Sequence, residues 1–509
     1  MRMLAALLAS LVFTFAYGAL AAKSRRAEQV LVPLLDILQS VPILGFLSFT
    51  VVAFMALFPG SVMGLELASI FAIFTSQAWN MTFSFYQSLK TVPPNLDEAA
   101  RSFHLSAWQR FWRVDVPFSM PGLVWNTMMS MSGGWFFVVA SEAITVNNHT
   151  LMLPGIGSYV ALAIDQRNLT AIGWAVLTML IVILLYDQLL FRPLVAWSDK
   201  FHVELSASEE TPRSWFLLVL HRTRLFGVLF APLTAGAAFL AQRPLRTLPR
   251  RMPAAPARAP SAGKSEWLWR VTITLAIAAG VGYIVDYLSH GVTWTEVATV
   301  TGLGFLTLLR VVVLMLLATL VWVPIGVWIG LHPRVAHATQ PLAQFLAAFP
   351  ANLVFPFAVV AIVHWHLTPD IWLSPLMVLG TQWYILFNVI AGASAFPNDL
   401  KEAAANFRIG GWNWWRKVIL PGIFPYYVTG AITASGGCWN ASIVAEIASW
   451  GDTTLRAHGL GAYIADATTA GNDHQIVLGI VAMSIFVIAF NRLLWRPLYG
   501  VAMRRMRLD

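Results

Sequence analysis

Long apolar stretches constrain the fold of this chain more than any other feature of its sequence. They recur near residues 3–22, 41–58, 64–88, 120–142, 170–191, 268–288, 308–331, 346–364, 371–392, 424–445 and 475–495. A helix needs about 20 such residues to cross a bilayer, because lipid offers no partners for unpaired backbone groups. Since 58% of the chain is hydrophobic and only 11% is charged, a soluble globule is excluded. The sequence therefore predicts an all-α polytopic membrane protein with about 11 transmembrane helices.

The formal net charge of +9 comes from the loops between these stretches. The basic residues form four clusters: Lys23, Arg25 and Arg26; Lys90, Arg101, Arg110 and Arg113; Lys401, Arg408, Arg416 and Lys417; Arg504, Arg505 and Arg507. Basic loops remain on the cytoplasmic side of a membrane. We therefore expect these loops to be cytoplasmic and 147–170, 364–370 and 452–474 to lie outside. The charge indicates a lipid bilayer as the partner, and no nucleic acid.

The N-terminal stretch has one alternative interpretation, because small residues at 16–22 precede Lys23 as in a signal peptide. An internal copy of the same stretch favours a membrane helix. Cys438 is the only cysteine, so neither an intrachain disulfide nor a cysteine-rich metal site is expected.

A duplication organises the chain. Sliding the sequence against itself by 304 positions aligns many Trp, Pro, Gly and charged residues without a gap from Trp79 onward. The pairs include Trp79/Trp383, Pro93/Pro397, Glu98/Glu402, Trp108/Trp412, Pro117/Pro421, Trp135/Trp439, Glu142/Glu446, Gly155/Gly459 and Arg192/Arg496. Further upstream the offset becomes 308, with the pairs Arg2/Arg310, Pro33/Pro341 and Pro42/Pro350. Each half is therefore a copy of one folding unit.

The duplication divides the chain into a first domain at 1–203, a linker at 204–266 and a second domain at 267–509. The copies run in the same direction, which predicts parallel repeats with substrate passing between them. The linker is rich in Pro, Ala and Arg after 242, and we place its apolar part, 215–240, on the cytoplasmic surface, with two extra crossings as the alternative. The helix expected at 267–288 has no counterpart before Arg2. The given start could be a downstream methionine, or the first domain could lack that helix.

One motif occurs in both halves, between the third and fourth helices of the first half and at the matched place in the second. Glu98-Ala99-Ala100 follows Pro93 and Asp97, and Glu402-Ala403-Ala404 follows Pro397. Proline suits the first turn of a helix, acidic residues near that end complement the helix dipole, and alanines permit close approach of another surface. These features indicate a short helix that docks a partner, whereas the alternative is an ordinary amphipathic loop helix.

The two motifs resemble the cytoplasmic EAA loop of binding-protein-dependent permeases, in which the alanines are followed by a hydrophobic residue and a proline, here Pro117 and Pro421. The resemblance implies a type I ABC importer permease of the bacterial inner (cytoplasmic) membrane, docked to a separate ABC ATPase in two copies. It also implies an extracytoplasmic substrate-binding protein. The residues expected to couple the chain to the ATPase are Glu98, Ala99, Ala100, His104, Pro117, Glu402, Ala403, Ala404, Arg408 and Pro421.

Both motifs depart from the family pattern at one position. The glycine usually found four residues after the second alanine is His104 in the first half and Arg408 in the second. The geometry of this turn is therefore not fixed by the motif. Similarity to nitrate, sulfonate, taurine and bicarbonate permeases extends over nearly the whole chain outside the linker, through Leu34-Leu35-Asp36 and the Gly155-Ile156-Gly157 stretch. The expected substrate is a small anion or small polar solute, although its identity does not follow from this similarity.

Four further residues are candidates for the translocation path: Trp135, Glu142, Trp439 and Glu446. An acidic residue at membrane depth is a functional hypothesis, because burying its charge is costly. The alternative for Glu142 and Glu446 is a carboxylate that caps or pairs in the outer loop. Trp79 and Trp383 are interpreted as interfacial or core aromatics rather than substrate clamps.

No cofactor, metal or catalytic residue is expected. Ala262-Gly263-Lys264-Ser265 lacks the earlier glycine of a phosphate-binding loop, and His364-Trp365-His366 is a poor metal site in a short outer loop. ATP hydrolysis is therefore assigned to a separate subunit, and the chain is not expected to be an enzyme. The alternatives are a secondary transporter driven by an ion gradient, which would need intramembrane charges, and a membrane-embedded enzyme, which would need clustered His, Asp or Glu.

Overall fold

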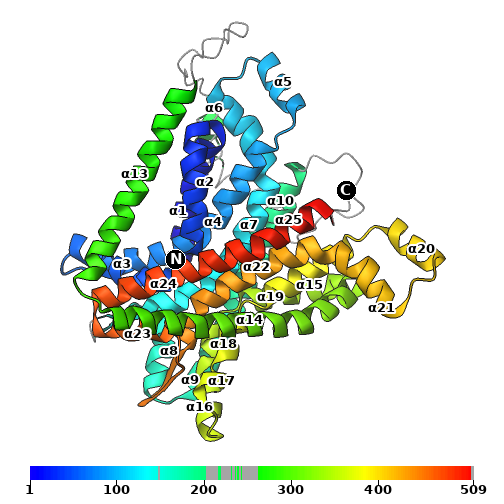
Figure 1. The fold of residues 1–509 in the computed structure, drawn as a ribbon. Helices are drawn as coiled ribbons and strands as arrows, with labels where there is room; N and C mark the ends of the chain where they lie inside the picture. The colour runs from blue at the N-terminus through cyan, green and yellow to red at the C-terminus, as the bar shows by residue number, and fades with distance from the viewer. Residues whose placement is uncertain are drawn as a thin grey trace.

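The computed structural model describes residues 1–146, 149–201 and 262–505, with a few isolated residues between 216 and 242. The described chain is a bundle of helices with two small β-hairpins (Figure 1). The first half contains α1 (Arg2–Lys23), α2 (Arg25–Ser40), α3 (Ile43–Leu57), α4 (Met63–Lys90), α5 (Pro94–Ser102), α6 (Ala107–Arg110), α7 (Val116–Glu142), β1 (Ala143–Val146), β2 (His149–Met152), α8 (Ile156–Asp165), α9 (Leu169–Tyr186) and α10 (Arg192–Ser198).

The second half repeats this order after one additional helix. It contains α13 (Ala262–Ser289), α14 (Trp294–Gly330), α15 (Pro333–Ala348), α16 (Phe355–His364), α17 (Pro369–Trp372), α18 (Ser374–Leu379), α19 (Trp383–Ser394), α20 (Asn398–Asn406), α21 (Gly411–Trp414), α22 (Leu420–Ala445), β3 (Ile447–Trp450), β4 (Thr453–Arg456), α23 (Leu460–Ala470), α24 (Asp473–Phe490) and α25 (Arg496–Arg505). The helix α13 contacts the rest of the described chain mainly through α24.

The two halves share irregular features as well as helices. Turns of π-helix precede α7 at Phe111–Asp115 and α22 at Trp415–Ile419, 304 positions apart. Each half also has a sharp bend before a matched proline: α2 meets α3 at 93°, and α15 meets α16 at 79°. The residue before a proline is held in extended conformation, and both bends follow this rule. These shared departures from regular helix confirm that the duplication extends to three dimensions.

Every expected apolar stretch falls on helix, with three differences in detail. The helix α14 begins at Trp294 rather than near 308, and the stretches expected at 346–364 and 371–392 are broken. The amphipathic helices α2 and α15 and the two hairpins were not expected. Among the described residues, six helices are long and apolar enough to span a membrane, or nine if each bent pair is one span, so the count of about 11 stays a prediction.

The halves pack on one shared core. Buried residues of both halves form a single continuous apolar cluster, and α7 of the first half contacts α15 of the second. The rings of Trp125 and Phe387 stack across this interface with centroids 5.5 Å apart. Most of the linker 204–266, including most of the apolar segment 215–240, lies outside the described residues.

Candidate functional site

The two Glu-Ala-Ala motifs form short helices that project from the body: in Figure 1, α5 lies at the top and α20 at the right, whereas α8, α16 and α17 lie at the bottom. In the first half, α5 begins at Pro94, a position where proline forfeits no helical hydrogen bond, and Asp97 lies in the first turn. Ala100 is 4% exposed and faces inward, and Ala404 in α20 has the same exposure. The second alanine of each motif therefore attaches its helix to the body. We call α5 and α20 the docking helices, after the role that the sequence predicts for them.

The helices α5 and α20 end in the same turn. The amide of Leu105 donates to the carbonyl of Ala100 at 3.0 Å, and the amide of Ile409 donates to that of Ala404 at 2.9 Å. One residue before each donor, His104 and Arg408 both adopt φ +51°. This left-handed conformation favours glycine. In each loop, the turn position where the family pattern has glycine is therefore occupied by a residue with a side chain, His104 in the first half and Arg408 in the second.

The outward face of each docking helix carries one carboxylate and one aromatic ring. Glu98 and Glu402 are exposed, and neither has an ion pair or hydrogen bond from its side chain within the described part of the chain. Phe103 and Phe407 are each 79% exposed. A large aromatic side chain held in the open at the same place in both halves is typical of an anchor for a partner protein.

The two docking loops are supported differently. In the first, Asp97 pairs with Arg101 at 2.6 Å and with Arg110, and Lys23 pairs with the buried Asp115 at 2.6 Å. A 304-residue shift places Lys401, Ala405, Trp414 and Ile419 at the matched positions of Asp97, Arg101, Arg110 and Asp115. The ion pairs that support the first loop are therefore not repeated at the matched positions of the second.

Pro117 and Pro421 lie in the first turns of α7 and α22. These prolines do not interrupt the chain's helical path. In the structure, α6 and α21 run through the π-turns into α7 and α22 without a break, and in the second half one helix is continuous over Gly411–Ala445. A movement of either docking helix is thereby linked directly to a membrane helix that lines the interface between the halves.

At the opposite ends of α7 and α22, each half contains an arginine bound by two carboxylates. Arg2 donates to Glu66 through Nε and Nη2, at 2.6 and 2.7 Å, and to Glu142 through Nη1 at 2.7 Å. In the second half, Arg310 binds Asp370 at 3.0 Å and Glu446 at 3.1 Å. The carboxylates match at the 304-residue offset, so this triad was duplicated with the fold.

Glu142 and Glu446 also hold the chain that follows each hairpin. The second oxygen of Glu142 accepts the amide of Gly157 at 2.7 Å, and that of Glu446 accepts the amide of Ala462 at 3.0 Å. A Cβ on Gly155 or Gly459 would lie 2.2 Å from the carboxylate. Glycine is therefore required for the chain to lie over the acid. These contacts are those of the alternative interpretation, a carboxylate that pairs in the outer loop.

The loops of the two halves that we expect to lie outside are in contact. The amide of Gly451, in the β3–β4 turn, donates to the carbonyl of Ile164 at 3.0 Å, and Arg167 pairs with Asp452 at 2.6 Å. Arg167 and Gly451 both have positive φ, 53° and 57°. Because the guanidinium lies directly over Gly451, a Cβ there would be 2.2 Å from its Nε.

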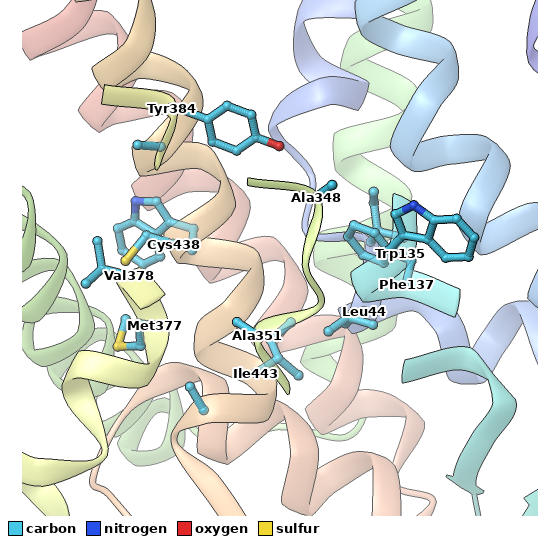
Figure 2. Packing of buried hydrophobic residues seen from close by; sticks show 14 of the residues in the cluster. Leu44, Trp135, Phe137, Ala348, Ala351, Met377, Val378, Tyr384, Cys438 and Ile443 are labelled. Carbon is cyan, nitrogen blue, oxygen red and sulfur yellow. The ribbon is translucent and has the colours of Figure 1, made fainter. Parts of the chain in front are cut away.

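A cavity of about 210 Å³ lies between the halves, and its described lining contains no Asp, Glu, Lys, Arg or His. The lining includes Trp79 of α4 and Ser130 and Gly133 of α7 from the first half, and Tyr384 of α19 and Asn440 of α22 from the second. Figure 2 shows Tyr384 extending from the second half with its hydroxyl directed toward the helices of the first. The cavity is thus a neutral, partly polar space at the interface.

The four candidate path residues lie outside this cavity. Trp135 lines a separate cavity of about 340 Å³ and packs edge-on against Tyr186, with ring centroids 5.1 Å apart. Trp439 is 1% exposed and packs near Phe486, whereas Glu142 and Glu446 belong to the outer triads. Their role in translocation stays a prediction.

Sequence reasoning missed several residues of these sites. Glu66 and Asp370 lie 13 positions before Trp79 and Trp383, and extending the 304-residue alignment upstream would have found them. The pairing of Arg167 with Asp452 and the place of Ser130 in the cavity carry no local signal. Within the described residues, no group of three or more His, Cys, Asp or Glu could hold a metal ion.

The family model described as "Binding-protein-dependent transport system inner membrane component" matches the chain twice, over residues 14–192 and 322–506. The nitrate import permease protein NrtB of Leptolyngbya laminosa is 26% identical over 189 residues, which are 37% of this chain and 63% of that protein. The bicarbonate transport system permease protein CmpB of Synechococcus elongatus is 27% identical over 205 residues, 40% of this chain and 68% of the relative.

A third relative is named for a different substrate. The glycine betaine/proline betaine transport system permease protein ProW of Escherichia coli is 31% identical over 155 residues, 30% of this chain and 42% of that protein. The match to the nitrate permease spans less than two thirds of that protein's length.

Proposed function

The chain belongs to the family of binding-protein-dependent transport system inner membrane components, and on that premise we propose that it forms the solute pathway of an ATP-driven importer. It is a multi-pass inner-membrane protein with both permease units in one polypeptide. Solute crosses between the two units, and ATP is hydrolysed by separate ATP-binding-cassette subunits. The chain itself supplies the path and the coupling, and no catalytic group.

One observation carries this proposal: two docking helices with the same backbone and the same exposed side chains. Glu98 and Phe103 of the first loop, and Glu402 and Phe407 of the second, form two equivalent projections from the body of the molecule. Each projection fits one ATPase subunit, which gives two copies per chain. Ala99, Ala100, His104, Ala403, Ala404 and Arg408 shape the projections, and Pro117 and Pro421 transmit their movement into α7 and α22.

The substrate and the extracytoplasmic partner follow from the relatives and from the outer face. Proteins named for nitrate and bicarbonate transport support a small anion or small polar solute as the cargo. The hairpins and the Arg167–Asp452 contact close the side opposite the docking helices, so a substrate-binding protein would engage there. A secondary transporter is disfavoured, because the described lining of the 210 Å³ cavity between the halves has no Asp, Glu, Lys, Arg or His for an ion gradient to act on.

The docking helices provide the test. Glu98→Lys and Glu402→Lys invert a charge at a contact that the ATPase would desolvate, which weakens such complexes by about 2–5 kcal/mol. Tagged wild-type chain should purify with ATPase activity inhibited by vanadate, each variant should lose most of it, and the double variant should lose all. Asp165→Lys, an exposed reversal at the end of α8 on the opposite side, is the matched control and should retain wild-type activity.

The opposite pattern would contradict the proposal. Suppose that the double variant retains full copurifying ATPase activity and full solute uptake, and that Asp165→Lys has the same ATPase activity. The projecting helices are then not the coupling elements.

A further inference from the structure

Two helix breaks form part of the wall of the cavity between the halves. The first elbow, residues 41–42, separates α2 from α3, and the second elbow, residues 349–350, separates α15 from the 3-10 turn that leads into α16. Ile43 and Ala351, the residues that follow the elbows, line the cavity of about 210 Å³. Figure 2 shows Ala351 between the labelled residues of α7 and α22. At such a break, a few backbone torsions are enough to change the shape of the wall.

The first elbow is bonded to the second half. The amide of Ile43 donates to the Oδ1 of Asn440 on α22 at 2.8 Å. This amide belongs to the first turn of α3, where the helix itself supplies no acceptor, and lipid supplies none either. The donor is a backbone N–H, so the amide oxygen of Asn440 must face it. Because Asn440 also lines the cavity, this bond joins the elbow to α22 at the cavity wall.

The second elbow is bonded to the first half in the reciprocal way. The Nδ2 of Asn352 donates to the carbonyl of Phe136 on α7 at 3.3 Å. Residues 351 and 136 are the repeat equivalents of 43 and 440, so the two bonds join the same pair of elements at the same place. The side chain comes from α22 in one bond and from beside the elbow in the other. The contact is thus repeated although the residues are not, and duplication of the sequence alone does not account for it.

Asn352 is costly at its position. Its repeat equivalent is Leu44, a buried apolar residue. The Oδ1 of Asn352 is buried and has no hydrogen-bond partner among the described residues, and an unpaired buried acceptor destabilises a protein. Packing alone would favour leucine at both positions. The bond to α7 is what the asparagine adds, which indicates that this contact serves more than stability.

The two bonds connect each elbow to the docking helix of the other half. The docking helix α20 is followed by a turn, by α21 and by a π-turn that continues into α22, which holds the first elbow through Asn440. The docking helix α5 is likewise followed by α6 and α7, and α7 holds the second elbow through Phe136. A rigid, packed helix transmits a displacement along its length. Movement of one docking helix would therefore reach the cavity wall that the other half contributes.

We propose that Asn440 and Asn352 are positioning residues, through which each docking helix moves the cavity-lining elbow of the opposite half. The inference rests on the proposed importer function and adds the route by which ATP hydrolysis reaches the cavity. Because the connections are crossed, the shape of the cavity depends on both docking helices. The alternative is that the two asparagines only stabilise the interface, in which case their loss lowers stability and leaves the response of the elbows to ATP unchanged.

A cysteine beside each elbow distinguishes these roles. In the full chain copurified with its ATPase, in lipid nanodiscs and with Cys438→Ala, Gln39→Cys reports on the first elbow and Ala347→Cys, at the matched position, reports on the second. Both native residues line the cavity. The rate of reaction with a small methanethiosulfonate reagent is measured without nucleotide and in the state trapped by ATP and vanadate. We expect the rate at both positions to differ between the two states.

The crossed connection predicts which variant affects which cysteine. Asn440→Leu should reduce the difference between the states at position 39 by about fivefold, the usual effect of losing one hydrogen bond, and leave position 347 unchanged. Asn352→Leu, which installs the residue of the matched position, should do the reverse. Asn440→Asp keeps an acceptor for the amide of Ile43 and should retain the response at position 39, which a loss of packing would not explain.

Asn388→Leu is the matched control, because its amide donates to the carbonyl of Tyr384 within its own helix, and it should leave both responses unchanged. Asn352→Leu removes an unpaired buried oxygen and should fold normally, so the test holds even if Asn440→Leu impairs folding. Responses that persist in both leucine variants, or that are lost at both positions in either one, would overturn the crossed coupling.

The ATPase activity of the same samples separates this inference from the importer function. A wild-type chain that purifies without vanadate-sensitive ATPase activity would refute the importer function, and the coupling with it. Normal ATPase activity in every variant without the crossed pattern of cysteine reactivity would overturn the coupling alone.

Discussion

Replacing Arg310 by methionine should destabilise the second half more than any exposed substitution. Its guanidinium is the only cationic side chain bound to Glu446 among the described residues, and Glu446 is 1% exposed. Methionine fills most of the volume and leaves the carboxylate with the hydroxyl of Thr307 and the amide of Ala462. Removing one partner of a buried ion pair costs about 3–5 kcal/mol, because a buried charge is left uncompensated.

The predicted loss can be measured as a change in melting temperature. A folding unit of about 200 residues loses about 2–4 °C per kcal/mol, so Arg310→Met should melt about 6–20 °C below the wild type in nanodiscs. Adding Glu446→Leu should restore much of the difference, since replacing both charges with apolar groups is often neutral.

The control for this experiment is Arg167→Met, which breaks an ion pair whose side chains are 53% and 98% exposed. Exposed pairs contribute about 1 kcal/mol or less, so its melting temperature should fall by no more than about 4 °C. The reasoning would be refuted if Arg310→Met behaved like this control, or if the double variant melted below the single one.

Three further predictions follow from the geometry. His104→Gly should stabilise the first docking loop by about 1 kcal/mol by relieving its left-handed conformation, seen as a higher melting temperature; a lower one would contradict the strain. Gly459→Ala should lower the melting temperature by several degrees, because its Cβ would collide with the Glu446 carboxylate, and normal stability would show that the loop shifts freely. In a cysteine-free background, a cysteine at Asn413 should resist membrane-impermeant thiol reagents in intact cells and one at Thr453 should react; the reverse result would invert the topology.

The docking motifs were predictable in position but not in detail. Their place between apolar stretches and their recurrence at one offset are properties of the linear sequence, so Glu98 and Glu402 could be named in advance. The backbone conformation of the turns at His104 and Arg408 could not be predicted from the linear sequence. A residue other than glycine is tolerated in the left-handed conformation only where the surrounding hydrogen bonds hold it.

The sequence located the apolar stretches correctly, but it did not predict where they bend or break. Apolar length fixes which segments enter the membrane, since backbone groups in lipid must pair within a helix. Whether a stretch is one helix or two depends on packing against neighbours, and the prolines at 42 and 350 produce bends that a hydropathy pattern does not reveal. The hairpins after Glu142 and Glu446 were missed because each strand has only four residues.

By itself, the sequence determined the membrane class, the duplication and the docking motifs, because each depends on local composition or on comparison of the chain with itself. Only the tertiary structure decided which charges and donors meet. Arg2 reaches Glu66 and Glu142 across 64 and 140 residues, and Trp79 faces the cavity while its equivalent Trp383 does not. Such contacts join segments far apart in the sequence, and packing between distant segments is set by the whole fold, so no local pattern reveals them.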